Sequence, residues 1–261
     1  MKKKIVSICL VLAILAVAAT GTLAYFTDYD GAENTFVFGN ISIKQLEKER
    51  IEQSDANTAD TNIKDFTQDK ELFPIVGDPA WAPDNQNWPT GGYTQLFTDA
   101  LGNVEDKFVF VENDGANDVY FRTLIAIEQG ALDYTTWDYV VGTVVNDTHY
   151  DMTVIATDVE IKGNEYVIYE FVYNRDNGAG AGVLEAGLTS RPSLLQVFLY
   201  KETTQEQVAL LDGNDDGKLN VLVVSQAVQT AGFSDAATAL DEAFGDLDAT
   251  SAAAYLAEYK A

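Results

Sequence analysis

His149 is the only histidine in the 261-residue chain, and this limits the hydrolytic chemistry that the sequence supports. A common zinc hydrolase needs two histidines one helical turn apart, with a glutamate general base between them. Serine and cysteine triads also need a histidine, and a zinc site made of carboxylates alone would be unusual. We therefore expect His149 to be an ordinary loop or strand-edge residue. We expect the chain to have no catalytic residue and no enzyme activity. Among 41 acidic residues, some two carboxylates will lie by chance at the separation that glycosidases use for catalysis. Such a pair therefore identifies no site.

A second candidate for chemistry is the acidic stretch from Asp212 to Asn220. Asp212, Asn214 and Asp216 match the first, third and fifth positions of an EF-hand calcium loop. The twelfth position, where a bidentate glutamate is required, is Val223, and the residues that follow the loop have the pattern of a strand rather than a helix. We expect a polar hairpin turn here and no metal or other cofactor. A weak calcium site at these three residues is the alternative.

The charge balance excludes two large classes of partner. With 41 acidic against 16 basic residues, the formal net charge is −25. A nucleic-acid-binding protein needs a basic face, and anionic lipid headgroups would repel this chain. The chain is nevertheless 47% hydrophobic, which is too apolar for an acidic disordered tail. We expect a folded protein with an apolar core and a strongly anionic surface.

Residues 1–24 have the layout of a secretory signal peptide. Three lysines at positions 2–4 precede the apolar run from Ile5 to Ala19, and small residues follow up to Ala24. We expect cleavage between Ala24 and Tyr25, which leaves a secreted chain without cysteine, with net charge −28 and no membrane attachment. The run is short for a membrane span, and an uncleaved N-terminal anchor is the alternative.

Two stretches carry a resemblance to a known family. Residues 21–28 (GTLAYFTD) and 34–41 (NTFVFGNI) form the first, and residues 106–115 (DKFVFVENDG), leading into 120–123 (YFRT), form the second. They resemble the TasA/camelysin family, whose members are secreted by Gram-positive bacteria and processed by the signal peptidase SipW. Residues 190–199 and 221–229 also resemble segments of uncharacterised secreted relatives.

The resemblance implies a fold and a mode of assembly. TasA-like proteins have a jelly-roll core, and the N-terminal segment of one subunit adds as a strand to the sandwich of the next. Such a contact supplies main-chain hydrogen bonds and, because it does not close, propagates into a filament. Here the donor would be residues 25–43, with the apolar anchors Tyr25, Phe26, Phe36, Phe38, Ile41 and Ile43. The alternative is an ordinary first strand of the chain's own sandwich.

The rest of the sequence predicts an all-β, jelly-roll-like antiparallel sandwich. Strand-like runs separated by Gly, Asn and Asp turns, with almost no helix between them, favour this architecture over βαβ units. The runs are 107–112, 119–128, 139–145, 150–157, 165–173, 193–200 and 219–229. Residues 119–128 are apolar on both faces, so we expect a loop, a helix or another subunit to cover the outer face. The sandwich core is expected to span 104–230.

Two other regions flank this core. Residues 44–103 are expected to be an irregular connection, with a short helix or solvated excursion at 44–62 and a short helix at 94–101. Residues 231–261 are expected to form short amphipathic helices packed on the core, with Ser234 as the first N-cap.

The expected function is structural: a TasA-like subunit of an extracellular or biofilm-matrix fibre, located outside the cell or at its surface. Its partners would be other copies of itself, a SipW-type signal peptidase during export and other matrix proteins. A monomeric adhesin or carbohydrate-binding sandwich is the alternative, in which Trp81, Trp88, Tyr93 and Trp137 would stack on sugar rings. A camelysin-like metallopeptidase is the third and is disfavoured by the single histidine.

Overall fold

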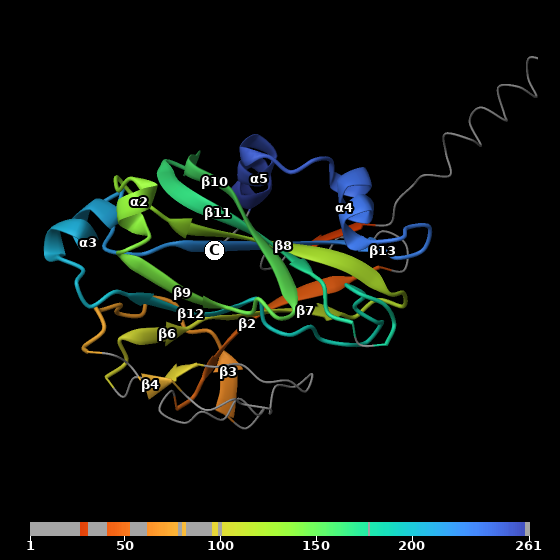
Figure 1. Ribbon diagram of the computed structural model, residues 1–261, viewed down its shortest axis with the longest axis horizontal. Coiled ribbons are helices and arrows are strands. Elements are labelled where there is room, and N and C mark those ends of the chain that lie inside the picture. Colours follow the sequence, from red (N-terminus) through yellow and green to blue (C-terminus); the bar gives the residue numbers. More distant parts are fainter. Residues whose placement is uncertain are drawn as a thin grey trace, which may run out of the picture.

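The computed structural model describes residues 27–30, 41–52, 62–77, 80–81, 96–98, 101–176 and 178–258. Its strands form antiparallel sheets stacked face to face, which confirms the predicted all-β antiparallel sandwich (Figure 1). The jelly-roll connectivity stays a prediction. Each of the seven predicted runs between residues 107 and 229 contains a strand at nearly the expected bounds, because turn residues punctuate the sequence at those places.

The first sheet has five strands in the order β1-β13-β8-β11-β10. Their bounds are β1 Thr27–Asp30, β13 Val221–Gln229, β8 Val119–Glu128, β11 Asn164–Tyr173 and β10 Tyr150–Ile161. Every residue of the central strand β8 is buried, which agrees with its apolar character on both faces. The two edges of this sheet are β1 and β10.

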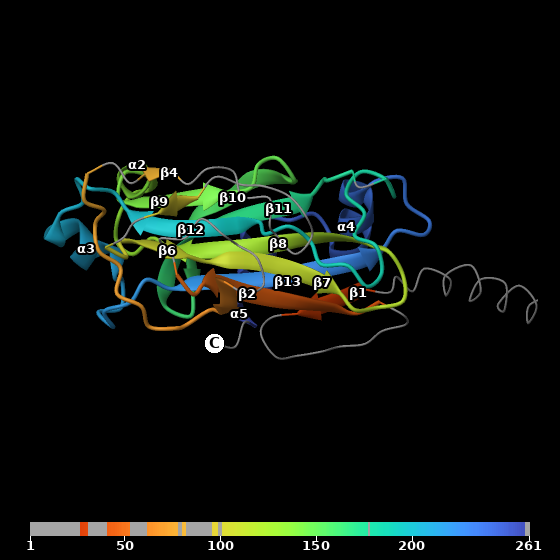
Figure 2. The same ribbon diagram turned by 90° about the horizontal axis from the view of Figure 1, so that it is seen from below.

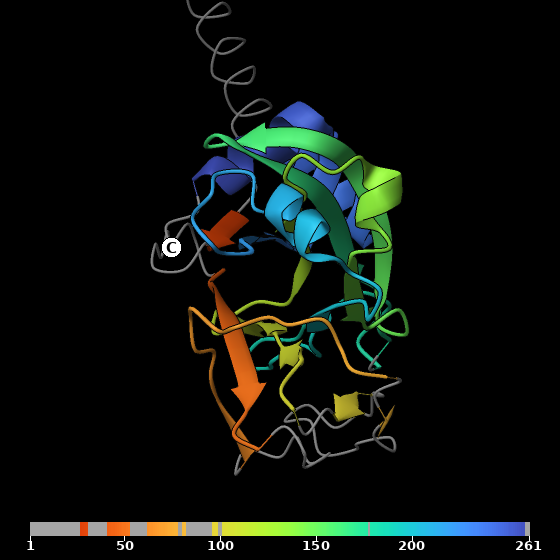
Figure 3. The same ribbon diagram turned by 90° about the vertical axis from the view of Figure 1, so that its left-hand side faces the viewer.

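The second layer is made of two three-stranded sheets. One has the order β6-β12-β9 (Val104–Asp106, Leu194–Leu199 and Val141–Val145), and the other has the order β3-β2-β7 (Ile63–Asp65, Ile43–Arg50 and Phe108–Asn113). Main-chain hydrogen bonds connect them, from Lys107 N to Leu195 O at 2.9 Å and from Ser193 N to Val109 O at 2.9 Å. A two-stranded pair, β4 Ala80–Trp81 with β5 Phe97–Thr98, lies beyond this layer (Figures 1 and 3).

The main core fills the space between the two layers, which lie one above the other in Figure 3, while Figure 2 looks from below onto the second layer. Phe121, Tyr150 and Tyr173 form its aromatic centre, with Phe121 stacked on Tyr173 at a centroid distance of 4.9 Å. Ile41 and Ile43, which are 0% and 1% exposed, pack into the same core. The residues just before and at the start of β2 are therefore part of this subunit's own interior.

Two C-terminal helices cover the outer face of the five-stranded sheet (Figure 1). Helix α4 spans Ala236–Phe244 and packs near Tyr120 and Val228, while α5 spans Ala249–Ala257 and packs near Leu124 and Ala126. This confirms that a second element covers the outer face of β8. The N-cap of α4 is Asp235 rather than the predicted Ser234, since the Asp235 carboxylate accepts from Thr238 N at 2.8 Å.

The structure corrects the prediction for residues 44–62. Residues 43–50 form strand β2, not a helix or a solvated excursion, because alternate side chains of this charged segment find partners in the second layer. The sandwich therefore begins before the predicted boundary at residue 104. The helix predicted at 94–101 is also wrong within the described residues, because Phe97–Thr98 is strand β5. Two further short helices, α2 Tyr134–Trp137 and α3 Gln205–Leu211, lie in connections of the sandwich.

Candidate functional site

The N-terminal strand β1 lies at an edge of the five-stranded sheet, antiparallel to β13. Thr27 is opposite Val228 and Asp30 is opposite Ser225, so β1 pairs with only the second half of β13. On its other side β13 pairs with β8 along its whole length, from Val221 to Gln229. A main-chain strand contact therefore already exists at the place where a donor strand would bind.

The first half of β13 has no strand opposite it among the described residues. Within this half, Val223 contacts β2, because the Gln45 amide donates to Val223 O at 3.4 Å, and the next paired residue, Ser225, donates its hydroxyl to Gln45 Oε1 at 3.1 Å. A longer strand than β1 would find further main-chain groups of β13 along this edge. Here a four-residue strand lies on a nine-residue strand, and strand addition in general uses main-chain groups of a sheet edge that lack a strand partner.

The opposite edge of the sheet, β10, is protected against such pairing. Its register with β11 shifts twice, between Val154 and Ala156 and between Ala156 and Val159, and Asp158 has a left-handed backbone with φ of 56°. Bulges twist an edge away from a partner, and outward charges oppose edge-to-edge association. At the other edge, β1 pairs with β13 in an uninterrupted register over its four residues.

The predicted anchors divide into two groups. Ile41 and Ile43 lie in the core of their own sandwich, as the alternative of an ordinary first strand predicted. Ala24, Tyr25, Phe26, Phe36 and Phe38 lie outside the described residues. Between these positions, Thr27–Asp30, which lies within the expected N-terminal strand 25–43, is the segment that the structure pairs with β13.

The loop with Asp212, Asn214 and Asp216 uses its side-chain oxygens on its own backbone. Asp212 accepts from Asp216 N at 3.0 Å and from Gly217 N at 2.7 Å, and Asp216 accepts from Lys218 N at 2.9 Å. These contacts make the polar turn that the sequence predicted before the last strand. Within the described part of the chain, no three His, Cys, Asp or Glu side chains gather as a metal-ligand group.

Glu128, which the sequence did not single out, lies buried beside this loop. Its carboxylate accepts from Asn220 N at 2.9 Å, from Asn220 Nδ2 at 2.6 Å and from Gly213 N at 3.3 Å. Burial raises the pKa of the Glu128 carboxyl above its usual value, against the effect of these hydrogen bonds. Glu128 therefore holds the loop to the end of β8 as a structural contact.

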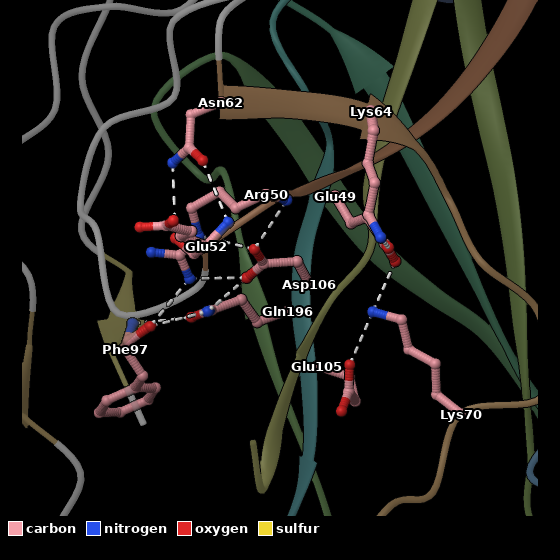
Figure 4. A network of polar contacts seen from close by, with 10 residues as sticks. All are labelled: Glu49, Arg50, Glu52, Asn62, Lys64, Lys70, Phe97, Glu105, Asp106 and Gln196. Atoms are coloured by element: carbon pink, nitrogen blue, oxygen red, sulfur yellow. Dashed lines mark hydrogen bonds and ion pairs between the residues drawn. The ribbon is translucent and has the colours of Figure 1, made fainter. Parts of the chain in front are cut away.

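A larger polar network ties β2 to β6 and β12 of the other sheet in the second layer (Figure 4). The Arg50 guanidinium binds Asp106 through two parallel hydrogen bonds, Nε to Oδ2 at 2.6 Å and Nη2 to Oδ1 at 2.7 Å. Gln196 Nε2 donates to the same Asp106 Oδ1 at 2.8 Å, and Arg50 Nη2 and Gln196 Nε2 both donate to Phe97 O. The pair is fully desolvated, with side-chain exposures of 0% and 1%.

A second part of this network surrounds Lys70, which lies between two carboxylates. Its ammonium is 2.5 Å from Glu49 Oε2 and 2.7 Å from Glu105 Oε2. Burial would raise the pKa of Glu49, but hydrogen bonds from Lys64, Lys70 and Thr67 outweigh it and lower the pKa. Glu105 has Lys70 as its main partner, so burial prevails and its pKa is raised. These ion pairs attach residues 62–70 to the sandwich.

The aromatic residues proposed for sugar stacking do not form a platform in the described structure. Trp137 is 1% exposed, and its indole N–H donates to Glu128 O at 3.0 Å, so it is a core residue. For Trp81 the structure describes only the backbone, and Trp88 and Tyr93 lie outside the described residues. His149 is half-buried in the loop before β10, as predicted, with Nδ1 3.0 Å from Asn146 Oδ1.

Comparisons with known proteins give no relative. No family model matches the chain, and neither a curated protein nor a solved structure matches it. Among the described residues, no helix is both long enough and apolar enough to cross a membrane. The functional interpretation therefore depends on the geometry of the chain itself.

Proposed function

We propose that this protein is a secreted structural subunit, TasA-like in its mode of assembly, that builds an extracellular fibre by N-terminal strand addition. The observation that carries the proposal is the pairing of the short strand β1 with half of β13, whose other half has no strand partner on this side among the described residues. In a fibre, the N-terminal segment of one subunit would occupy the β13 edge of the next. The signal-peptide pattern of residues 1–24 supports export, after which the mature chain would begin at Tyr25.

The burial pattern limits the exchanged segment. Ile41 and Ile43 are in the core of their own subunit, so the donor would consist of residues 25–40 and the chain would cross between subunits before Ile41. Exchange at this edge would leave Ile41 and Ile43 in their own subunit, where they pack with Phe121, Tyr150 and Tyr173 in the described core. This permits a folded monomer and a fibre made of the same sandwich.

A backbone-specific pair of variants tests the proposal. Consecutive residues of a strand direct their N–H groups to opposite sides, so replacing both Asp28 and Tyr29 by proline removes one N–H that faces β13. Alanine at both positions removes the same side chains and charge but keeps both N–H groups. We expect filaments by electron microscopy from residues 25–261 and from the alanine variant, and none from the proline variant.

A truncated chain provides the second arm. A protein that starts at Asn40 keeps Ile41 and Ile43 but lacks the whole donor, so we expect a folded monomer without filaments. Equal filament formation by all four proteins would contradict strand addition. Absence of filaments from residues 25–261 across pH, salt and protein concentration would contradict the fibre itself.

A further inference from the structure

Two arginines and the single histidine lie at one end of the sandwich, and neither arginine forms an ion pair with a carboxylate of the described residues. His149 precedes β10, Arg175 follows β11, and Arg191 lies in the connection that leads to β12. Tyr150 and Tyr173, the terminal pair of β10 and β11, lie between them. In a chain of net charge −25, two arginines without an acidic partner are unexpected.

Arg191 is the central residue of this cluster. Only 4% of its surface is exposed, and its Nε and Nη1 atoms are buried without a hydrogen-bond partner. An arginine carries five N–H donors and cannot relieve its burial by losing a proton, so a buried guanidinium normally has a carboxylate or several carbonyl groups as acceptors. Here three N–H donors, one on Nε and two on Nη1, have none among the described residues.

The neighbouring groups add positive charge rather than cancel it. Burial, with the nearby charge of Arg175, lowers the pKa of Arg191 to about 10. Burial and the charges of Arg191 and Arg175 lower the pKa of His149 to about 4. Arg175 lies against the hydroxyl of Tyr173, which fixes it on the same side of the cluster. An anion at this position would interact favourably with every charged member of the cluster.

The surrounding backbone holds the cluster in place. The Tyr150 hydroxyl donates to Arg191 O at 2.5 Å, and Asn146 Nδ2 donates to Pro192 O at 3.1 Å. Asn174 N donates to His149 O at 3.0 Å, which connects the ends of the loops on either side. The backbone at Arg191 and Pro192 is therefore fixed by buried contacts with Tyr150 and Asn146.

We propose that His149, Arg175 and Arg191 form a binding site for a single oxyanion group, a carboxylate or a phosphate. The group has two sources, a small free anion or an acidic side chain of a second copy of this chain. Its oxygens would accept from the unpartnered Arg191 nitrogens and from Arg175, while His149 would lie at its side. The site is separate from the β13 edge, so its existence does not depend on fibre assembly.

The single histidine gives a direct measurement. His149 contributes one imidazole resonance to the spectrum of the untagged full chain, and we expect phosphate or acetate to move it in a saturable manner. Arg175→Met removes a half-exposed arginine and is expected to weaken anion binding about tenfold or more, because charge-assisted hydrogen bonds are the strong ones. Arg191→Met should do the same, and Arg175→Met keeps the test valid if Arg191→Met does not fold.

The matched control is Lys218→Met, which removes one positive charge at the opposite end of the sheet from an exposed lysine paired with Asp69. It should leave the anion affinity unchanged. Sedimentation of the same variants distinguishes the two sources. If no free anion binds but Arg175→Met weakens self-association and Lys218→Met does not, the site takes a carboxylate of a second copy. If phosphate, sulfate and acetate leave the His149 resonance unmoved at about 50 mM and the arginine variants self-associate like the control, the inference is wrong.

Discussion

Removing Asp106 should be far more damaging than removing any surface carboxylate of this protein. Asp106→Ala leaves the Arg50 guanidinium, with 0% side-chain exposure, without its bidentate partner. Arg50 would keep its hydrogen bond to Phe97 O at 3.1 Å, but it would lose both hydrogen bonds to a carboxylate, and Gln196 would also lose an acceptor. Breaking a buried ion pair by removing one partner costs about 3–5 kcal/mol, mostly because the remaining charge stays buried. We expect a loss of free energy of unfolding in this range.

The magnitude is measurable by urea unfolding followed by circular dichroism. With a slope of roughly 2–3 kcal/mol per molar urea, a loss of this size lowers the midpoint by roughly 1–2 M. The matched control is Asp65→Ala, whose carboxylate pairs with Lys48 but has a side-chain exposure of 89%. An exposed pair of this kind contributes roughly 0.2–1 kcal/mol.

A compensated variant separates the charge effect from a general loss of packing. Arg50→Met combined with Asp106→Leu removes both charges and fills the same volume, so it should be at least about 1 kcal/mol more stable than Asp106→Ala alone. If the free energies of unfolding of Asp106→Ala and Asp65→Ala differ by less than about 0.5 kcal/mol, the reasoning is refuted. The Arg50–Asp106 pair would then not be a buried ion pair whose loss leaves an unpaired charge.

Three further predictions follow from single contacts. Gly130 has a φ of 62°, and Gly130→Ala places a Cβ 2.2 Å from the carbonyl oxygens of Leu210 and Leu211. The substitution should therefore lower the free energy of unfolding by more than about 3 kcal/mol in the same assay, and a loss below about 1 kcal/mol would contradict this prediction. Leu256→Ala, at 0% exposure under α5, should cost about 2–5 kcal/mol, and the exposed Leu188→Ala, measured as control, should cost less than about 1 kcal/mol. The pKa of His149 is lowered in the folded chain to about 4, so its contribution to stability is complete above pH 6.5 and is lost as pH falls towards 4. Between pH 6.5 and pH 4, the free energy of unfolding should therefore fall by about 1–2 kcal/mol less in His149→Gln than in the unmodified chain, after allowance for solvent screening. An equal fall in both proteins would contradict this prediction.

The sheets could be predicted from the sequence because their signal is local. Residues 119–128 are apolar on both faces, and turn residues bound each of the later runs, so both existence and limits of these strands follow from short-range patterns. The cover of β8 by helices also followed, since an apolar outer face must be buried by some other element. Confirmation came from α4 and α5, whose apolar residues recur at helical spacing.

The charged strand β2 could not be predicted in this way. Its sequence, IKQLEKER, has the composition of a solvated helix, and each charge is acceptable in a strand only because a distant residue neutralises it. Arg50 meets Asp106, and Lys107 meets Glu47, across more than fifty residues of sequence. Such long-range pairing overrides local propensity, and no periodicity in a single sequence reveals it.

The same limit applies to the candidate sites. The calcium pattern at Asp212, Asn214 and Asp216 was visible because its spacing is local, yet the structure uses these oxygens on the backbone of the turn. Conversely, His149, Arg175 and Arg191 are separated by many residues and share no motif. Only the pairing of β10 with β11 and the return of the chain towards β12 bring them together.

Net charge and edge geometry together determine when the proposed assembly would occur. Subunits of net charge −28 after cleavage repel one another, and this repulsion acts at every contact between copies. The main-chain hydrogen bonds gained on the β13 edge are independent of salt, whereas the repulsion is screened within about 8–10 Å at physiological ionic strength. Salt, acid or divalent cations should therefore increase light scattering by residues 25–261 and leave the Asp28→Pro/Tyr29→Pro variant unaffected. If that variant scatters as strongly as the unmodified chain in high salt, charge neutralisation alone drives association and the β13 edge is not the contact that forms.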